Sequence, residues 1–239
     1  MLSYKKILFT GGSGRFGEIF KNIHGVKKYI YPTSKEFNIL KLNLIKNYLK
    51  KKKPDLVIHC AALSRPMKIH DDDIVKSIDL NIIGTCNLVK ACSLLNIKII
   101  YFSTCYVYSG LRGDYKEQDS LLPANNYAWS KLGGEAAVKL YKNSLILRIS
   151  MTEKPFVHKS AFKDFITNFI FHDEVAKFLP KLFKYKGIIN VGGPSQSAYE
   201  FAKRYNPNIK GVLKKKMKIK ENKLNFSMNI KKLKRIISD

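Results

Sequence analysis

Acidic residues are scarce in this sequence of 239 residues: Asp and Glu number 18 against 44 Lys and Arg, a formal net charge of +26. Such an excess attracts anions, among them nucleotides and nucleic acid. The lysine clusters at 50–53 and 214–220 are not interleaved with aromatic residues, as a groove for single-stranded nucleic acid would be. We expect a basic surface that helps to capture a nucleotide, with no specific nucleic-acid partner. Compositional bias of an AT-rich genome is the alternative origin of the charge.

Long apolar runs and paired cysteines are also missing. No apolar run approaches the roughly 18 residues that cross a bilayer, and the run before the first glycines is shorter than the about 7–15 residues of a secretory signal. The four cysteines form no CxxC pair, which favours buried thiols in a reducing compartment. The five histidines lack ligand spacing. We therefore expect a cytoplasmic protein with no metal and no membrane partner.

Short apolar runs alternate with helical stretches, which is typical of βαβ units in a parallel sheet. The sequence predicts an α/β fold of the Rossmann type, with a doubly wound parallel sheet and a small, shortened C-terminal substrate-binding part. The expected strands are Lys6–Thr10, Lys28–Tyr31, Leu56–Cys60, Lys98–Ser103, Ser144–Ile149 and Gly187–Val191. The expected helices are Phe16–Ile23, Ile45–Lys52, Lys76–Leu95, Trp129–Lys142 and one near Asp173–Phe183.

The first expected strand runs into a glycine-rich turn, TGGSGRFG, and then into a helix. Glycine is needed there because the turn uses backbone angles closed to other residues and because a pyrophosphate must touch the backbone. The helix N-terminus offers unpaired N–H groups and a partial positive charge to the phosphates. We therefore expect nucleotide binding at this turn, at Gly11, Gly14, Arg15, Phe16 and Gly17.

The second expected strand indicates which dinucleotide binds. Versions of the turn that bind NAD usually follow with an acidic residue at the end of the second strand, for the ribose hydroxyls. Here that strand ends without one, and Ser34, Lys35 and Arg15 are placed to hold a 2′-phosphate. We favour NADP, with NAD as the alternative cofactor and a merely solvated Lys35 as the alternative interpretation of that residue.

A tyrosine and a lysine four residues apart, Tyr127 and Lys131, share one face of an expected helix. A tyrosine hydroxyl has a pKa of about 10. An adjacent ammonium and the positive charge of a nicotinamide lower this pKa toward neutral pH, where proton transfer is efficient. Ser103 and Thr104 end the fourth expected strand, at the sheet edge where ligands of such folds bind. We expect these residues to form a catalytic group.

These pieces resemble the extended short-chain dehydrogenase/reductase family, nearest to nucleotide-sugar reductases of the dTDP-4-dehydrorhamnose reductase type. The matching segments are TGGSGRFG, PDLVIHCAA, LNIIGTCNL, FSTCYVYSG, YAWSKLGGE, LILRIS, INVGGP and NFSMNIKKLKRII. The resemblance implies a catalytic triad of Thr104, Tyr127 and Lys131, with Tyr127 as proton donor to a keto oxygen. It also implies cofactor contacts from Ala61, Ala62, Leu63, Ser103, Tyr127 and Lys131, and a place for Asn81 behind the site or as a buried structural residue.

Two departures from the family's pattern bear on function. The family's Ser-Thr-Asp motif reads Ser103-Thr104-Cys105, so the acid of a dehydratase is missing. The stretch after Arg148 is shorter than in the family, and it normally supplies much of the sugar-nucleotide pocket. We expect a cofactor-binding domain at 1–150 and a reduced substrate-binding region at 151–239, with a strand and a helix returning to the main domain. There Phe156, Lys159 and Lys163 either touch a base or phosphate or serve packing and surface charge.

The leading hypothesis is an enzyme that reduces a nucleotide-linked 4-keto sugar with NAD(P)H. A nucleotide-sugar epimerase or dehydratase is a second hypothesis, and a cofactor-binding regulatory subunit without turnover is a third. The expected partners are the nucleotide sugar and a second copy of the chain in a homodimer. The complete triad favours catalysis, because a non-catalytic module has no need of all three residues.

Overall fold

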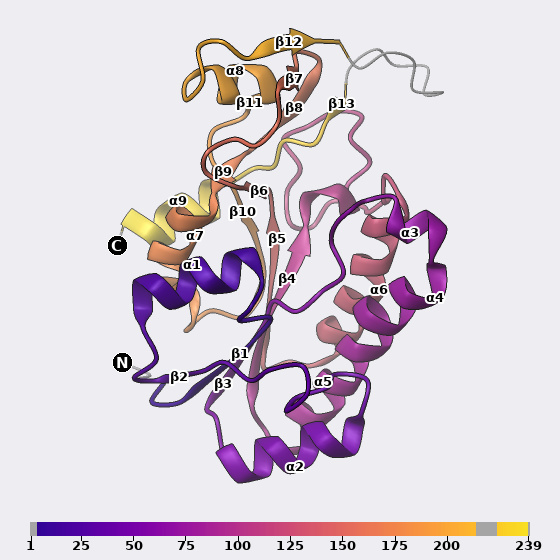
Figure 1. The fold of residues 1–239 in the computed structure, drawn as a ribbon, viewed down its shortest axis with the longest axis vertical. Coiled ribbons are helices and arrows are strands. Elements are labelled where there is room, and N and C mark those ends of the chain that lie inside the picture. The colour runs from indigo at the N-terminus through magenta and orange to yellow at the C-terminus, as the bar shows by residue number, and fades with distance from the viewer. Residues whose placement is uncertain (1–3, 214–223, 239) are drawn as a thin grey trace.

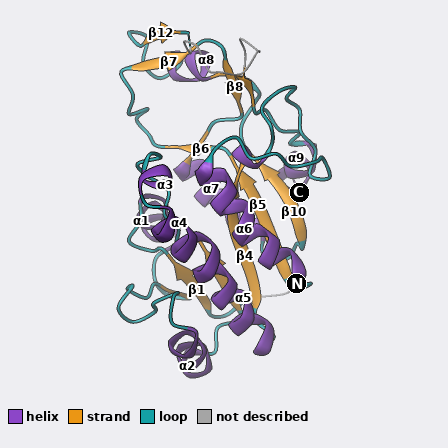
Figure 2. Ribbon diagram, turned by 90° about the vertical axis from the view of Figure 1, so that its right-hand side faces the viewer, coloured by secondary structure: helices purple, strands orange, loops and turns teal. Residues whose placement is uncertain are grey.

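The centre of the computed structural model is one parallel sheet with helices on both faces (Figures 1 and 2). The structure describes residues 4–213 and 224–238, so the lysine cluster at 214–220 lies outside the described residues. Within the described ranges no helix is both long and apolar enough to span a membrane.

Six parallel strands form the sheet in the order β10-β5-β4-β3-β1-β2. Their bounds are β1 (Ile7–Thr10), β2 (Tyr29–Ile30), β3 (Leu56–His59), β4 (Lys98–Thr104), β5 (Ser144–Ile149) and β10 (Gly187–Val191). The chain passes from β1 outward to β2 and then crosses to β3 on the other side of β1. Ligands of open α/β sheets bind at such a reversal of strand order, outside the carboxyl ends of the strands.

Two helical layers cover the sheet, which confirms the doubly wound α/β fold. One layer holds α1 (Arg15–His24), α7 (His172–Phe178), the 3₁₀ turn η3 (Leu179–Leu182) and α9 (Lys231–Ser238). The other holds α2 (Leu42–Lys52), α5 (Gly84–Leu94) and α6 (Asn126–Leu140). Strands β1, β3, β4 and β5 are buried along their whole length, as expected of parallel strands covered on both faces.

Two of the expected helices are interrupted in the structure. The stretch predicted as one helix over Lys76–Leu95 is α4 (Ile74–Ser77), a π-helical segment η1 (Ile78–Ile83) and then α5; a short helix α3 (Ile69–Asp72) precedes it. Single π-helical turns often occur at functional sites. The helix expected near Asp173–Phe183 ends at Phe178 and continues as η3, since Pro180 has no N–H for an α-helical bond.

Helix α6 begins three residues before the predicted Trp129, and the reason is its N-cap. The Asn125 side chain accepts a hydrogen bond from the Ala128 N–H at 2.9 Å. Asn is among the preferred N-cap residues because its side chain satisfies a free N–H of the first turn. Tyr127 therefore lies in the first turn of α6 and Lys131 one turn further on.

A small lobe lies beyond the carboxyl ends of the central strands, at the top of Figure 1. Its elements are β7 (Ser160–Phe162), β8 (Phe165–Thr167), β11 (Gln196–Ser197), α8 (Ala198–Lys203), β12 (Lys210–Val212) and β13 (Leu224–Asn225). The short pair β6 (Met151–Thr152) and β9 (Ile170–Phe171) joins it to the main sheet. The lobe has an apolar core of its own, made of Ala161, Phe165, Ala198, Ala202, Ile209, Leu224 and Phe226.

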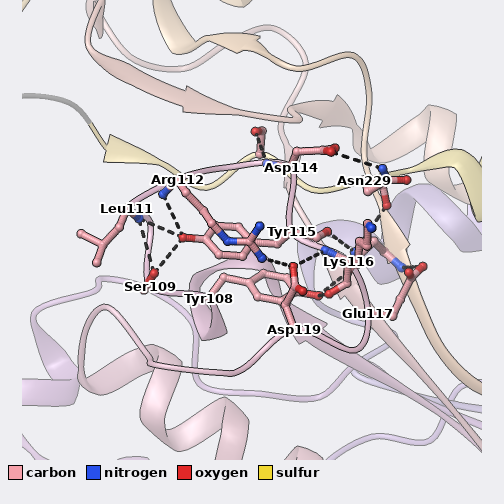
Figure 3. Close-up of polar contacts among 12 residues, drawn as sticks. Tyr108, Ser109, Leu111, Arg112, Asp114, Tyr115, Lys116, Glu117, Asp119 and Asn229 are labelled. Atoms are coloured by element: carbon pink, nitrogen blue, oxygen red, sulfur yellow. Dashed lines mark hydrogen bonds and ion pairs between the residues drawn. The ribbon is translucent and has the colours of Figure 1, made fainter.

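The loop after the 3₁₀ turn η2 (Cys105–Val107) ties the C-terminal segment to the main domain (Figure 3). The Tyr115 hydroxyl accepts hydrogen bonds from the N–H groups of Leu111 at 2.9 Å and Arg112 at 3.2 Å. The Tyr115 carbonyl accepts one from the Asn229 N–H at 2.8 Å, and the Asn229 amide donates to Asp114 at 3.4 Å. This loop thus fixes the segment between β13 and α9.

Candidate active site

The turn between β1 and α1 is a cradle with no room for larger side chains. Gly11 has a φ of +76°, and a Cβ there would lie 2.7 Å from the backbone nitrogen of Ala61. A Cβ on Gly17 would overlap the carbonyl oxygen of Gly11. The N-cap residue of α1 is Gly14, which has no side chain to cap the first N–H groups of the helix. The close backbone and the uncapped helix end fit a dinucleotide phosphate.

The other residues that were expected to hold the cofactor near this turn differ in how exposed their side chains are. Phe16 is 4% exposed, and its ring packs 5.2 Å from that of Phe102, so its side chain belongs to the core. Ser34 and Lys35 are exposed beyond β2. Glu36, which follows them, is turned back onto Thr33: it accepts hydrogen bonds from the Thr33 N–H and hydroxyl, both at 2.9 Å.

The segment after β3, residues 61–63, is held from two sides. The Ala61 N–H donates to the Thr10 hydroxyl at 3.2 Å. The Asn81 side chain, in η1, accepts from the Leu63 N–H at 2.8 Å and donates to the Leu63 carbonyl at 2.9 Å. It also donates to the Ser130 hydroxyl at 2.8 Å, which links the segment to α6. Asn81 therefore fixes the backbone that is expected to run beside the cofactor, a role that the motif alone left open.

Thr104 and Tyr127 meet at the carboxyl edge of the sheet. Thr104 ends β4 and is 4% exposed, while Tyr127 comes from the first turn of α6. Burial raises the pKa of Tyr127 above its ordinary value, with a further contribution from Cys105, and a hydrogen bond with Thr104 acts in the opposite direction. The sequence predicted a phenol made more acidic by Lys131 and the cofactor. In the chain itself desolvation is the larger effect, so the phenol holds its proton.

Lys131 is buried one turn after Tyr127 on α6. Its side chain is 3% exposed, and its Nζ lies 4.2 Å from the centroid of the Tyr101 ring. Burial lowers the pKa of Lys131 to about 8, and the nearby Cys60 and Glu135 act in the opposite direction. Burial therefore disfavours the charged form of this side chain.

Ser103, expected as an auxiliary cofactor contact, is engaged in a buried network. Its hydroxyl donates to the Glu135 carboxylate at 2.6 Å, and Arg148 donates to the same carboxylate at 2.6 Å. Ser103 lies in β4, Glu135 in α6 and Arg148 in β5. The network locks the strand that carries Thr104 to the helix that carries Lys131.

Sequence reasoning missed three residues near the glycine turn: Arg65, Glu153 and His172. The Glu153 carboxylate pairs with Arg15 at 2.5 Å and with Arg65 at 3.3 Å. The His172 ring lies 5.9 Å from that of Phe16, and burial lowers its pKa to about 4. No periodicity or spacing marks these residues, because they come from separate connections of the fold. The only available signal was the position of Arg65, two residues after the segment that the resemblance assigned to the cofactor.

The remaining residues singled out in the sequence lie beside Thr104 or in the small lobe. Cys105 is 2% exposed and has the hydroxyls of Ser150 and Thr167 as hydrogen-bond partners. Phe156 packs in an aromatic cluster with the lobe's core, 6.3 Å from the Phe201 ring. Lys159 and Lys163 are exposed. In the part of the chain that the structure describes, no three His, Cys, Asp or Glu side chains gather as metal ligands.

The fold and the site define an α/β protein of the dinucleotide-binding type, with a hydroxyl, a phenol and an ammonium at the carboxyl edge of the sheet. The family model described as RmlD substrate binding domain matches residues 5–171. The chain belongs to this family, which confirms the resemblance to extended short-chain dehydrogenases/reductases with a nucleotide-sugar reductase branch.

Relatives in the curated proteins carry two different names. Methionine adenosyltransferase 2 subunit beta from Bos taurus is 31% identical over 143 residues, which are 56% of this chain and 42% of that protein. The dTDP-4-dehydrorhamnose reductase from Mycolicibacterium smegmatis is 30% identical over 138 residues, 56% of this chain and 41% of that protein. The matched part of the chain thus spans less than half the length of these relatives.

A solved structure supports the fold over nearly the whole chain. The dTDP-4-dehydrorhamnose reductase from Bacillus anthracis, in complex with NADP, superposes with a TM-score of 0.83 at 21% identity. The match covers 98% of this chain and 92% of that one. The small lobe and the returning C-terminal helix are therefore included in the shared fold.

Proposed function

We propose that this chain is an NAD(P)-dependent reductase of a nucleotide-linked 4-keto sugar. What supports the proposal is that Thr104 ends β4 while Tyr127 and Lys131 stand one turn apart on α6, with Tyr127 close enough to Thr104 for the two to interact. NADP is the favoured cofactor, and the named Bacillus anthracis relative in complex with NADP supports it. NAD is the alternative. The small lobe is the proposed substrate-binding region.

The residues of the site divide the work between them. The bound cofactor supplies the hydride. Tyr127 holds a proton on its hydroxyl at neutral pH, because burial raises its pKa, and it gives this proton to the keto oxygen. Thr104, at the end of β4, orients the phenol in this proposal and binds the same oxygen. Lys131 stabilises the phenolate that remains. Since Cys105 is a buried thiol in place of an acid, the site favours reduction over the dehydratase alternative.

Replacing the phenol tests this assignment. We expect Tyr127→Phe to lower turnover by a factor of at least about 10², while NADPH still binds, because the proton donor is lost and the glycine turn is not. Turnover is followed as loss of NADPH absorbance with a dTDP-linked 4-keto-6-deoxy sugar. Tyr141→Phe, at the C-cap of the same helix, is the matched control. Full activity of Tyr127→Phe would contradict the mechanism.

A second candidate function is a regulatory subunit that binds the cofactor without turnover. The relatives named methionine adenosyltransferase 2 subunit beta favour it. The same assay separates the two functions. The regulatory role is supported if the wild-type chain binds NADPH but does not oxidise it in the presence of any keto sugar tested, and if Tyr127→Phe leaves NADPH binding unchanged. Assembly of two copies into a homodimer stays a prediction from the family resemblance.

A further inference from the structure

One carboxylate bridges two arginines across the mouth of the glycine turn. Glu153 follows β6, Arg15 is the first residue of α1, and Arg65 lies in the connection after β3. A single oxygen, Oε1 of Glu153, lies 2.5 Å from Nη1 of Arg15 and 3.3 Å from Nη1 of Arg65. The carboxylate side chain is 17% exposed, against 51% and 39% for the two arginines. The acid is therefore the enclosed member of the bridge.

The surroundings of this bridge favour an anion with more than one charge. Two guanidiniums face one carboxylate, and the uncapped N-terminus of α1 adds partial positive charge. His172, 8% exposed, interacts electrostatically with all three residues. Its Nδ1 is buried and has no hydrogen-bond partner among the described residues. A buried ring nitrogen without a partner is costly, so it marks a place for a further polar group.

We propose that Glu153 holds the place of a phosphate between Arg15 and Arg65, and that the diphosphate of a bound dinucleotide exchanges for it. This inference rests on the proposed cofactor site and deepens it. Guanidinium forks bind carboxylate and phosphate with the same geometry, so one anion replaces the other without rebuilding the site. When phosphate enters, the Glu153 carboxylate is released toward solvent with the segment after β6.

Arg65 connects this exchange to the catalytic group. Its positive charge acts on the Tyr127 phenol, where it favours the phenolate, and on Tyr106. In this proposal Glu153 holds the Arg65 guanidinium in the free protein, and phosphate holds it in the complex. The guanidinium therefore keeps its position in both states. The cofactor thereby binds to a site that is already ordered, which reduces the entropy lost on binding.

The test compares binding, not turnover. NADPH and, separately, inorganic pyrophosphate are titrated by calorimetry into the wild type and the variants Glu153→Gln, Arg65→Gln and the double variant. Since the arginines are partly exposed, we expect Glu153→Gln to bind both probes about fivefold more tightly and Arg65→Gln about fivefold more weakly at low salt. The gain from Glu153→Gln shrinks in the Arg65→Gln background, and both effects shrink as salt is raised.

Asp72→Asn, which breaks the exposed pair with Lys68 in α3, is the control and leaves both affinities unchanged. If Glu153→Gln binds pyrophosphate no more tightly than the wild type, the exchange is overturned whatever NADPH does. If pyrophosphate binding follows the expected order while no variant binds NADPH or NADH, the exchange stands and the dinucleotide proposal fails. Glu153→Ala, which also removes the carboxylate, repeats the test should Glu153→Gln not fold.

Discussion

At the scale of the residue, the site is dominated by a cation taken out of water. Lys131 lies on the face of Tyr101 and next to His59, whose pKa is lowered to about 3 by burial and by the Lys131 charge. His59 is satisfied as a neutral ring by hydrogen bonds with the Thr10 and Thr85 hydroxyls at 2.9 and 3.0 Å. The neighbourhood therefore accommodates the ammonium at a cost to folding.

We expect Lys131→Met to unfold at a temperature several degrees higher than the wild type at pH 7. The pKa of Lys131 is about 8 in the folded chain, against an ordinary value of 10.5 for lysine. Below pH 8 both states carry the charge and the cost is complete. Between these two pKa values the folded state releases the proton before the unfolded state does, so the stability of the wild type rises with pH. The difference in unfolding temperature between Lys131→Met and the wild type therefore becomes smaller. Thermal unfolding from pH 6 to 10.5 measures it.

The matched control is Lys139→Met, which removes an exposed lysine from the same helix. A constant difference between wild type and Lys131→Met across the window would mean that the ammonium is solvated and that its burial carries no cost.

At the scale of the element, the approach of α1 to β1 depends on two glycines of different kinds. Gly17 faces the backbone of Gly11 and Gly12 so closely that a Cβ has no space, which lets the helix lie directly on the turn. Gly14 has an ordinary φ of −81°, and a Cβ there would lie 3.2 Å from the Gly11 carbonyl oxygen. The helix end and the phosphate cradle are therefore set by Gly17 more than by Gly14.

We expect Gly17→Ala to lower the free energy of unfolding by about 1–3 kcal/mol, because the methyl group forces backbone apart. NADPH binding should weaken in parallel, since the N–H groups of α1 shift away from the turn. Gly14→Ala is the comparison and should change stability much less. Urea unfolding and calorimetric titration measure both; equal effects at the two positions would refute the packing argument.

At the scale of the whole molecule, a buried ion pair joins the parts that form the site. Arg148 on β5 donates to Glu135 at 2.6 Å, to the Tyr108 hydroxyl at 2.8 Å and to the Glu117 carbonyl at 3.1 Å. Tyr108 in turn donates to Asn190 on β10 at 2.9 Å. The sheet, helix α6 and the loop of Figure 3 that holds the C-terminal segment thus share one polar network.

We expect Glu135→Gln to destabilise the chain by about 3–5 kcal/mol, because it leaves the Arg148 charge buried without its partner. The double variant Glu135→Leu/Arg148→Met should recover much of this loss, since no charge stays buried. The exposed pair Lys68/Asp72 gives the reference, and Asp72→Asn should cost less than about 1 kcal/mol. A loss for Glu135→Gln no larger than for Asp72→Asn, in urea unfolding, would show that the network is not structural.

Much of the fold could be predicted because its signals are local. Strands β5 and β10 begin and end where the apolar runs predict, and the glycine spacing at 11, 14 and 17 marks the turn. The pair Tyr127 and Lys131 follows from helical spacing once the helix is recognised. The predicted direction of the Tyr127 pKa shift was wrong for the chain itself, because periodicity does not report how much water surrounds a hydroxyl.

The amino-acid order by itself determined most of the strands and helices and the glycine turn, and it marked the hydroxyl, phenol and ammonium of the proposed site, since each depends on residues within a few positions. Only the tertiary structure decided that Glu153 meets Arg15, 138 positions away, and that Glu135 meets Arg148 inside the core. Such pairs depend on how connections from different strands converge at one edge of the sheet. That convergence is a property of the packed molecule, and no local spacing encodes it.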